Sequence, residues 1–186
     1  MQTTETRMVQ HAARDGAIRE SALETEQRQY LTFQLGEEIF AIDILTIREI
    51  IEYGYLTEVP MTPPCIRGVI NLRGAVVPVV DLAVRFGRPV KGNSKRTCIV
   101  IVEIESAKGC QEMGVVVDAV NEVLGIPQAD IEPAPEFGTR IRSDFVQEMG
   151  KINGKFVVIL DVNRVLSLDE IAVVETMSRE SVPQPA

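Results

Sequence analysis

Four aspartates, Asp43, Asp81, Asp118 and Asp161, are the side chains whose type and spacing could support chemistry. Two carboxylates that meet in a fold can act as general acid and base or bind a cation. Each of the four, however, directly follows a short apolar run, at the point where the hydrophobic period changes. That position is typical of a helix N-cap, whose carboxylate accepts a hydrogen bond from the first helical turn. We therefore interpret all four as structural caps.

Other residues that enzymes use for catalysis are scarce. The only histidine is His11, in a polar stretch near the start of the chain, so the sequence offers no histidine-containing triad. The three cysteines, Cys65, Cys98 and Cys110, are odd in number and lack metal-ligand spacing, which is typical of reduced thiols in a cytoplasmic protein. Neither a Walker loop nor a strand-linked Gly-x-Gly-x-x-Gly motif is present. We predict no enzyme activity, no metal and no cofactor.

Arg73 is one of two charged residues that could contact a partner. It lies with Gly74 between two β-branched runs, residues 69–72 and 75–80, and this pattern predicts a hairpin with a tight turn. Pro78 cannot donate a hydrogen bond to a neighbouring strand, so we expect the second strand to lie at a sheet edge or to carry a bulge. Arg73 is then either a solvated turn residue or a contact beside an apolar edge.

Glu49 is the other charged candidate. Asp43 predicts a short helix that ends by Gly54, with Ile44, Ile47 and Ile51 on one face and Glu49 among them. A glutamate on such a helix is either part of a solvated face or a contact residue, and the pattern alone leaves both open.

Composition limits the class of protein. The chain has 186 residues, of which 45% are hydrophobic and 25% charged, and its net charge is −8. An acidic chain with 5% aromatic residues lacks the basic, aromatic surface that nucleic-acid binding needs. No apolar run is long enough to span a bilayer, and residues 1–29 lack the apolar core of a signal peptide. We expect a cytoplasmic globular protein that does not insert into membranes.

Two segments of the chain repeat. The spacing from a turn glycine through an apolar strand to an aspartate is the same in residues 74–81 and 154–161, and residues 40–47 resemble residues 115–123 in the same order. Two such pairs favour duplication of a small β unit, although strand–aspartate junctions are common enough to match by chance.

Short strands, tight turns and short helices predict a mainly β protein of the barrel class. We expect a disordered tail over residues 1–28, a first subdomain over 29–90 and a second over 91–162. The Pro/Gly-containing linker at residues 88–96 marks the boundary between the subdomains. A C-terminal helix that packs back on the barrels is expected over residues 163–178, followed by a tail over 179–186.

Several motifs, in sequence order, closely resemble the family of the chemotaxis coupling protein CheW. They are Tyr-Leu-Thr-Phe-Gln-Leu-Gly at residues 30–36, Ile-Asp-Ile-Leu at 42–45, Arg-Glu-Ile at 48–50, Gly-Val-Ile-Asn-Leu-Arg-Gly at 68–74, Pro-Val-Val-Asp-Leu at 78–82, Gly-Val-Val-Val-Asp at 114–118 and Ile-Glu-Pro-Ala-Pro-Glu-Phe at 131–137. The resemblance extends over about residues 30–177. It implies two SH3-like five-stranded β-barrel subdomains around a shared core.

The resemblance also implies a function, that of a non-enzymatic adaptor. Such a protein binds the cytoplasmic tip of chemoreceptors and the regulatory domain of the histidine kinase CheA, and is recruited to membrane-bound receptor arrays. Neither the receiver domain of CheV-type proteins nor the catalytic domains of the kinase are expected in this chain. The alternatives are a small barrel that binds a ligand or catalyses a reaction between its subdomains, and an oligonucleotide-binding barrel, which the acidic composition disfavours.

Carried over residue by residue, the resemblance predicts two sets of contact residues. The groove that would receive the receptor tip is expected to contain Ile44, Ile47, Glu49, Arg73, Val117 and Val120. The edge that would face the kinase is expected to contain Val76, Val77 and Val79.

Overall fold

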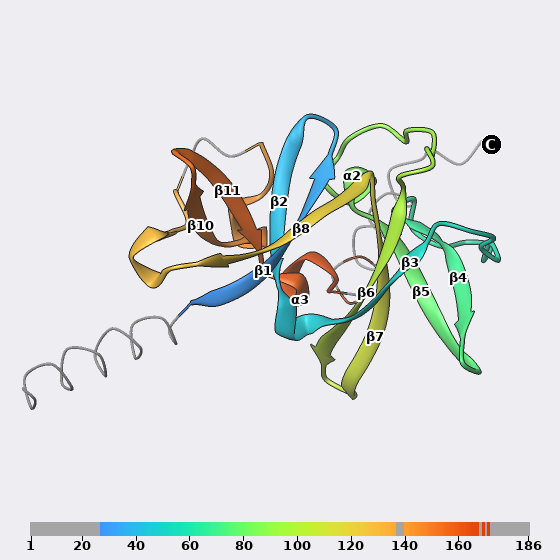
Figure 1. The fold of residues 1–186 in the computed structure, drawn as a ribbon. Helices are drawn as coiled ribbons and strands as arrows, with labels where there is room; N and C mark the ends of the chain where they lie inside the picture. The colour runs from blue at the N-terminus through green and yellow to red at the C-terminus, as the bar shows by residue number, and fades with distance from the viewer. Residues whose placement is uncertain (1–26, 137–139, 168, 170, 172–186) are drawn as a thin grey trace, which may run out of the picture.

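The computed structural model describes residues 27–136, 140–167, 169 and 171, which form two β-sheets joined by short helices (Figure 1). The first sheet has the order β8-β1-β2-β11-β10-β9 and the second the order β3-β6-β7-β5-β4. The first sheet contains β1 (Arg28–Leu35), β2 (Glu38–Asp43), β8 (Ala119–Ile126), β9 (Ile131–Pro133), β10 (Val146–Ile152) and β11 (Lys155–Leu160). The second contains β3 (Ile47–Glu52), β4 (Ile66–Leu72), β5 (Ala75–Asp81), β6 (Cys98–Ser106) and β7 (Gly109–Val117). This mainly β fold with two SH3-like subdomains confirms the predicted fold class.

The helices of the described residues are all short. They are η1 (Ile44–Thr46), α2 (Leu82–Arg85), η2 (Gln128–Asp130), η3 (Ser143–Phe145) and α3 (Val162–Val165). No helix among them is long and apolar enough to cross a membrane. The predicted N-terminal tail lies outside the described residues except at its end, and so does most of the predicted C-terminal helix. Ile171, from that helix, is buried in the core.

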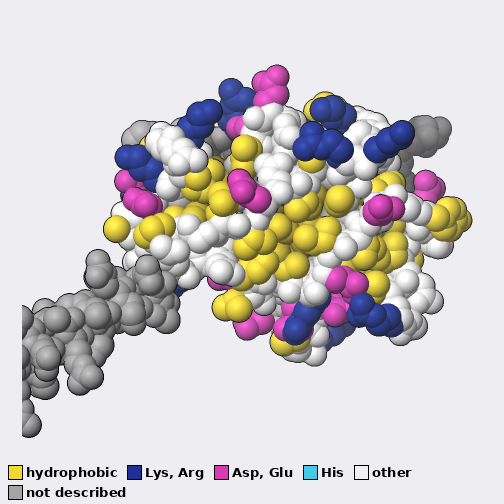
Figure 2. All heavy atoms as spheres, viewed as in Figure 1, with side chains coloured by type: hydrophobic (Ala, Val, Ile, Leu, Met, Phe, Trp, Pro, Cys, Tyr) yellow, Lys and Arg dark blue, Asp and Glu magenta, His cyan; other side chains and the backbone are white. Residues whose placement is uncertain are grey.

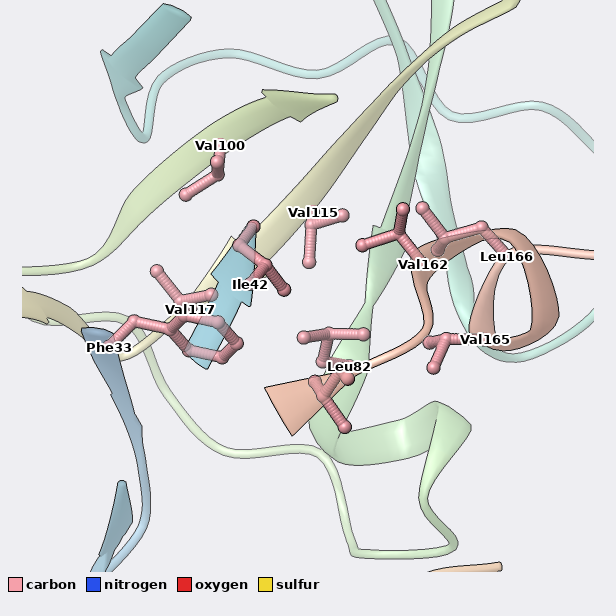
Figure 3. A pocket seen from close by; sticks show the side chains of 10 residues that line it. Phe33, Ile42, Leu82, Val100, Val115, Val117, Val162, Val165 and Leu166 are labelled. Carbon is pink, nitrogen blue, oxygen red and sulfur yellow. The ribbon is translucent and has the colours of Figure 1, made fainter. Parts of the chain in front are cut away.

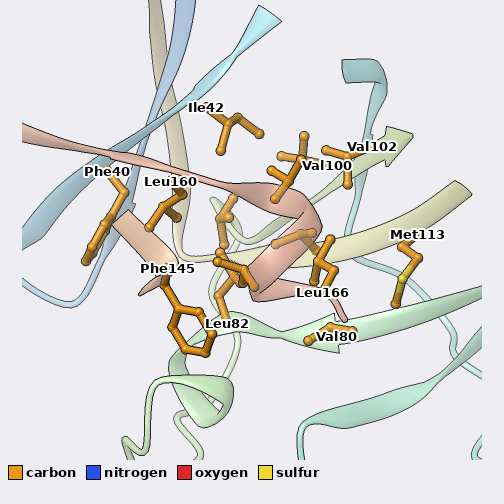
Figure 4. Packing of buried hydrophobic residues seen from close by; sticks show 14 of the residues in the cluster. Phe40, Ile42, Val80, Leu82, Val100, Val102, Met113, Phe145, Leu160 and Leu166 are labelled. Carbon is orange, nitrogen blue, oxygen red and sulfur yellow. The ribbon is translucent and has the colours of Figure 1, made fainter. Parts of the chain in front are cut away.

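The central strands are apolar on both faces because both faces are buried. On β6, Val100 and Val102 point to a core shared by the two sheets, whereas Ile99 and Ile101 point to the interior of the second sheet. The first sheet has a matching interior around Tyr30 on β1. The described residues therefore form three hydrophobic clusters, one within each subdomain and one shared between the two sheets. Figure 4 shows the packing in the shared cluster.

The shared core is closely packed. A cavity within it measures about 10 Å³ and is lined only by apolar side chains, among them Phe33, Val117 and Leu166 (Figure 3). That volume is no larger than one water needs, so this cavity offers no room for a substrate.

The two sheets do not follow the predicted subdomain boundary. The first sheet takes β1 and β2 from the first half of the chain and β8 to β11 from the second, whereas the second sheet is continuous from β3 to β7. The linker at residues 88–96 joins α2 to β6 and contacts both sheets: Arg88 pairs with Glu38 of the first, and the Lys91 carbonyl accepts a hydrogen bond from Arg67 of the second. The division into residues 29–90 and 91–162 therefore needs correction: the sheets divide near Asp43 and near Asp118.

The repeated segments occupy equivalent places. The hairpin β4–β5 leads into α2 as the hairpin β10–β11 leads into α3. Both turns have two consecutive residues with positive φ: 51° at Arg73 and 86° at Gly74, 50° at Asn153 and 78° at Gly154. Each second strand then pairs in parallel with a strand of the other repeat, β5 with β7 and β11 with β2. The repeats have thus exchanged strands.

The prediction of a helix from Asp43 to Gly54 is wrong. A single 3₁₀ turn, η1, is followed by the strand β3, which pairs with β6 from Ile47 to Glu52. The isoleucine-rich sequence favours a strand, and its partner lies about fifty residues further along the chain, so local periodicity could not reveal the pairing. Glu49 consequently lies on a strand.

Candidate functional site

Arg73 and Glu49 lie together at one end of the second sheet. Arg73 is at the β4–β5 turn and Glu49 on β3, and these elements belong to the two opposite edges of the sheet. The Arg73 Nη2 atom is 2.8 Å from Glu49 Oε1 and donates a hydrogen bond to Oε2 at 2.9 Å. The ion pair spans the two sheet edges at this end.

The Arg73 side chain remains open to solvent in spite of this pair. Its side chain is 76% exposed, whereas that of Glu49 is 26% exposed. Guanidinium groups carry five donors in a planar fork, so the remaining donors can bind a carboxylate or carbonyl of another molecule. Glu49 therefore holds the Arg73 guanidinium in position while most of that group stays accessible to a partner.

An apolar strip adjoins the boundary between the two sheets. Ile44 of η1, Ile47 of β3 and Val120 of β8 are half-buried, and all three pack against the shared core. Leu45, which follows Ile44 in η1, is 87% exposed, and Val123, three residues after Val120 on β8, is 48% exposed. Sequence reasoning missed both because it expected helices after Asp43 and Asp118. Figure 2 shows hydrophobic side chains across the middle of the face on which β8, β6 and β3 lie. We call Ile44, Leu45, Ile47, Val120 and Val123 the apolar strip.

Val117 does not belong to this surface. It was expected to line the groove, but its side chain is completely buried in the shared core. It faces the same side of β7 as Met113 and Val115, which also belong to that core. Since side chains alternate along a strand, Val117 packs inward where Val120, beyond the bend at Asp118, stays half-exposed.

The predicted kinase-facing edge also needs correction. Strand β5 lies between β4 and β7, and Val77 and Val79 are buried inside the second sheet. Only Val76 is accessible, at 72% exposure. The pairing with β7 begins at Val79, just after Pro78, so the proline lies on the half of β5 that has one neighbour. Sequence alone could not show the second neighbour, because β7 comes from far along the chain.

Three of the four aspartates act as N-caps. Asp43 accepts a hydrogen bond from the backbone N–H of Leu45, Asp81 from Val84, and Asp161 from Asn163 and Arg164. Asp118 is different, because the strand β8 follows it rather than a helix. Its Oδ2 accepts a 2.7 Å hydrogen bond from the N–H of Gly36, in the turn between β1 and β2. The interpretation of Asp118 as a helix cap is therefore wrong. Asp118 instead fixes the β1–β2 turn of the first sheet.

A cleft between β3 and β4 is a feature that sequence reasoning missed. It has a volume of about 380 Å³, and Ile51, Ile70 and Leu72 are among its lining residues. Tyr55, which also lines it, is 91% exposed. The cleft exists because β3 and β4 are the two outer strands of the sheet, joined beyond it by the bridge between Thr57 and Val69. No local pattern brings these strands together.

Groups for metal or redox chemistry are not assembled in the described part of the chain. There, no three His, Cys, Asp or Glu side chains are placed to hold a metal ion. The three cysteines are free, and burial raises the pKa of the Cys65 thiol, which favours its unreactive protonated form.

Comparison with known proteins gives this geometry a family. A family model described as the CheW-like domain matches residues 29–170. The chain belongs to the CheW-like family. The chemotaxis protein CheW of Klebsiella aerogenes is 33% identical over 156 residues, which cover 84% of this chain and 92% of that protein. The chemotaxis protein CheW of Helicobacter pylori is 35% identical over 144 residues, covering 77% and 84%.

A solved structure supports the fold of this CheW-like chain. The scaffolding protein TtCheW from Thermoanaerobacter tengcongensis has a TM-score of 0.70 and 37% sequence identity, and the match covers 77% of this chain and 94% of that one. The match confirms the resemblance that the motifs indicated.

Proposed function

We propose that this chain is a non-enzymatic chemotaxis adaptor that couples chemoreceptors to the histidine kinase CheA in receptor arrays at the membrane. Its relatives are named chemotaxis proteins, and the similar solved structure is titled a scaffolding protein. An adaptor needs separate surfaces for its partners and no catalytic centre, and the apolar strip and the edges of the second sheet are two such surfaces.

The apolar strip is the observation that carries the proposal, and it fits the receptor. A helical hairpin presents apolar side chains at intervals of three and four residues, which suit an extended hydrophobic surface. Leu45 protrudes from η1 at 87% exposure, whereas Ile44 and Ile47 are fixed by the shared core. Leu45 therefore offers apolar area that a partner would remove from water, on a base that does not have to reorder on binding.

The second sheet supplies the surface for the kinase. Its outer strands β3 and β4 border the cleft, whose volume suits a large apolar side chain of a partner. Strand edges offer unpaired backbone groups to another barrel, and Arg73 and Glu49 add charge at one end. Of the edge residues expected from sequence, Val76 remains a candidate for this contact.

Pull-down and titration with a receptor cytoplasmic fragment and the regulatory domain of CheA test this assignment. We expect Leu45→Asp to weaken receptor binding at least about tenfold, since it places a charge in an apolar contact, and to leave kinase binding intact. Tyr55→Ala should do the reverse. Phe156→Asp is the matched control, because Phe156 is 55% exposed on β11 of the other sheet. Full binding of both partners by the Leu45 and Tyr55 variants would refute the proposal.

A further inference from the structure

The loop between α2 and β6 concentrates positive charge on an acidic protein. Between Asp81 and Glu103 the chain has no acidic residue, but it has five basic ones, Arg85, Arg88, Lys91, Lys95 and Arg96. The whole chain has a net charge of −8, so this stretch has the opposite sign to the chain. Figure 2 shows Lys and Arg side chains gathered over this loop, at the upper right.

Some of the positive charges near the loop are neutralised by acids, and others are not. Arg67 pairs with the buried Asp81 at 2.6 Å, and Arg88 pairs with Glu38. Within the residues that the structure describes, no ion pair joins Lys91, Lys95 or Arg96 to an acid, and all three are exposed. We call Lys91, Lys95 and Arg96 the basic triad.

The loop holds the basic triad in an ordered frame. Arg67 Nη2 donates to the carbonyl of Lys91 at 3.4 Å, although Lys91 lies far from Arg67 in sequence. The N–H of Ser94 donates to Thr97 Oγ1 at 2.9 Å, and the N–H of Arg96 donates to Ser94 Oγ at 3.1 Å. Thr97 is itself buried. These hydrogen bonds fix the backbone that carries the triad. Because the loop is already ordered, it loses less conformational entropy when a ligand binds.

One apolar side chain accompanies the charges. Val90 is 65% exposed and precedes Lys91 in the loop. Apolar contact next to several cations favours a ligand with carboxylates and at least one hydrophobic residue. The triad falls within six consecutive residues, a length that spans at most about 20 Å of extended chain, so a short segment would cover it.

We propose that the basic triad is a docking site for a short acidic segment of a partner polypeptide. A long polyanion such as nucleic acid would extend beyond the triad. Its remaining phosphates would then be repelled by the net negative charge of this protein. A short acidic peptide has a complementary charge and is short enough to contact only the triad.

The basic triad is separate from the surface assigned above to the receptor. It borders the second sheet, because the carbonyl of Thr97, next to Arg96, accepts a hydrogen bond from the N–H of Tyr53 just after β3. In Figure 1 its loop lies at the upper right, whereas η1, from which Leu45 protrudes, lies at the lower centre. The proposal therefore does not depend on the identity of either partner.

Fluorescence anisotropy with a labelled, glutamate-rich peptide that contains one leucine tests the proposal on the full chain. We expect binding at low salt that weakens steeply between about 0.05 and about 0.5 M salt, because screening shortens the reach of exposed charges. The triple variant Lys91→Gln, Lys95→Gln, Arg96→Gln should bind at least about tenfold more weakly, and a glutamine-rich version of the peptide should not bind.

A second triple variant controls for net charge. Lys108→Gln, Lys151→Gln, Lys155→Gln removes the same charge from exposed positions on other turns and strands and should leave peptide affinity unchanged. An equal loss of affinity in both triple variants would overturn the proposal, as would absence of peptide binding at low salt. Tighter binding of single-stranded DNA or of phosphatidylserine vesicles through the basic triad would also overturn it, in favour of another class of ligand.

Discussion

Arg73 and Asn153 hold the same position in two equivalent turns, and comparing them indicates that the turn itself does not require an arginine. Both have φ near 50° and both precede a glycine, as a tight hairpin turn with two positive φ values requires. Asn-Gly is the preferred pair there, whereas arginine in this conformation costs roughly 1 kcal/mol. The ion pair with Glu49 at most balances that cost, because exposed pairs contribute about 0.2–1 kcal/mol. Stability alone therefore does not explain an arginine at this turn, which supports the proposal that Arg73 contacts a partner.

Replacing Arg73 with asparagine separates these two roles. We expect Arg73→Asn to change the free energy of unfolding by less than about 1 kcal/mol, since a better turn residue compensates for the lost ion pair. We also expect it to weaken receptor–kinase assembly by at least about 2 kcal/mol, the scale of an interfacial charged contact. Urea denaturation gives the first quantity and titration of the complex the second. Normal assembly by Arg73→Asn would make Arg73 a turn residue only.

Exchange of the two charges gives an independent check. The double variant Arg73→Glu, Glu49→Arg can rebuild the ion pair within this chain but presents a carboxylate where a partner would meet a guanidinium. We expect the double variant to remain folded, as judged by circular dichroism, and to assemble as poorly as Arg73→Glu alone. Recovery of assembly in the double variant would show that the internal pair is what matters.

Asp81 and Asp161 are equivalent caps with different surroundings. Asp81 is buried, at 4% exposure, and binds the Arg67 side chain as well as the first turn of α2, whereas Asp161 caps α3 near the surface. We expect Asp81→Ala to cost about 3–5 kcal/mol of stability, because it leaves Arg67 without its buried partner. Asp161→Ala should cost about 0.5–2 kcal/mol, the usual value of a cap. Equal losses of unfolding free energy for the two variants in urea denaturation would show that the ion pair of Asp81 with Arg67 adds no stability beyond the cap.

At the scale of elements, sequence predicted what depends on neighbouring residues. The hairpins around Gly74 and Gly154 follow from turn residues between β-branched runs, and both are present. The strand β3 was mistaken for a helix because its only sheet partner, β6, lies far along the chain. Val79 was placed at an edge for the same reason, since its neighbour on β7, Gly114, is distant in sequence. Val77 precedes that pairing and is buried in the hydrophobic cluster of the second sheet. Long-range pairing decides these cases, and one sequence does not display it.

Gly68 marks a place where two elements meet too closely for any other residue. Its φ is 149°, and a Cβ atom there would lie 2.5 Å from the carbonyl oxygen of Thr57, which is bridged to Val69. We expect Gly68→Ala to cost at least about 2 kcal/mol of stability through strain and displacement of that bridge. Gly54→Ala is the control, because a Cβ at Gly54 meets no atom within 4 Å. Thermal unfolding of the two variants compares them, and equal melting temperatures would contradict the expected strain.

At the scale of the whole molecule, the repeats and the sheets divide the chain differently. Duplication was visible in the sequence because it preserves spacing, but the exchange of strands between repeats was not. Equivalent strands of the two repeats have similar apolar patterns. The pattern therefore does not show which repeat supplies a given strand to each sheet. Of the residues expected in the receptor groove, Ile44, Ile47 and Val120 pack half-buried against the shared core, whereas Val117 is buried within it. That the first three contact a receptor stays a prediction.

Strand exchange predicts how the chain responds to being cut at the linker. Fragment 1–90 would retain β3 without β6, its only partner, and fragment 91–186 would retain β8 without β1. The hairpins left in each fragment are marginally stable alone, and the shared core draws on both halves. We therefore expect neither fragment to unfold cooperatively on heating, and an equimolar mixture to regain a cooperative transition and native-like circular dichroism. Cooperative unfolding of fragment 1–90 alone would mean that the subdomains follow the linker after all, and that the exchanged pairings are not needed for the fold.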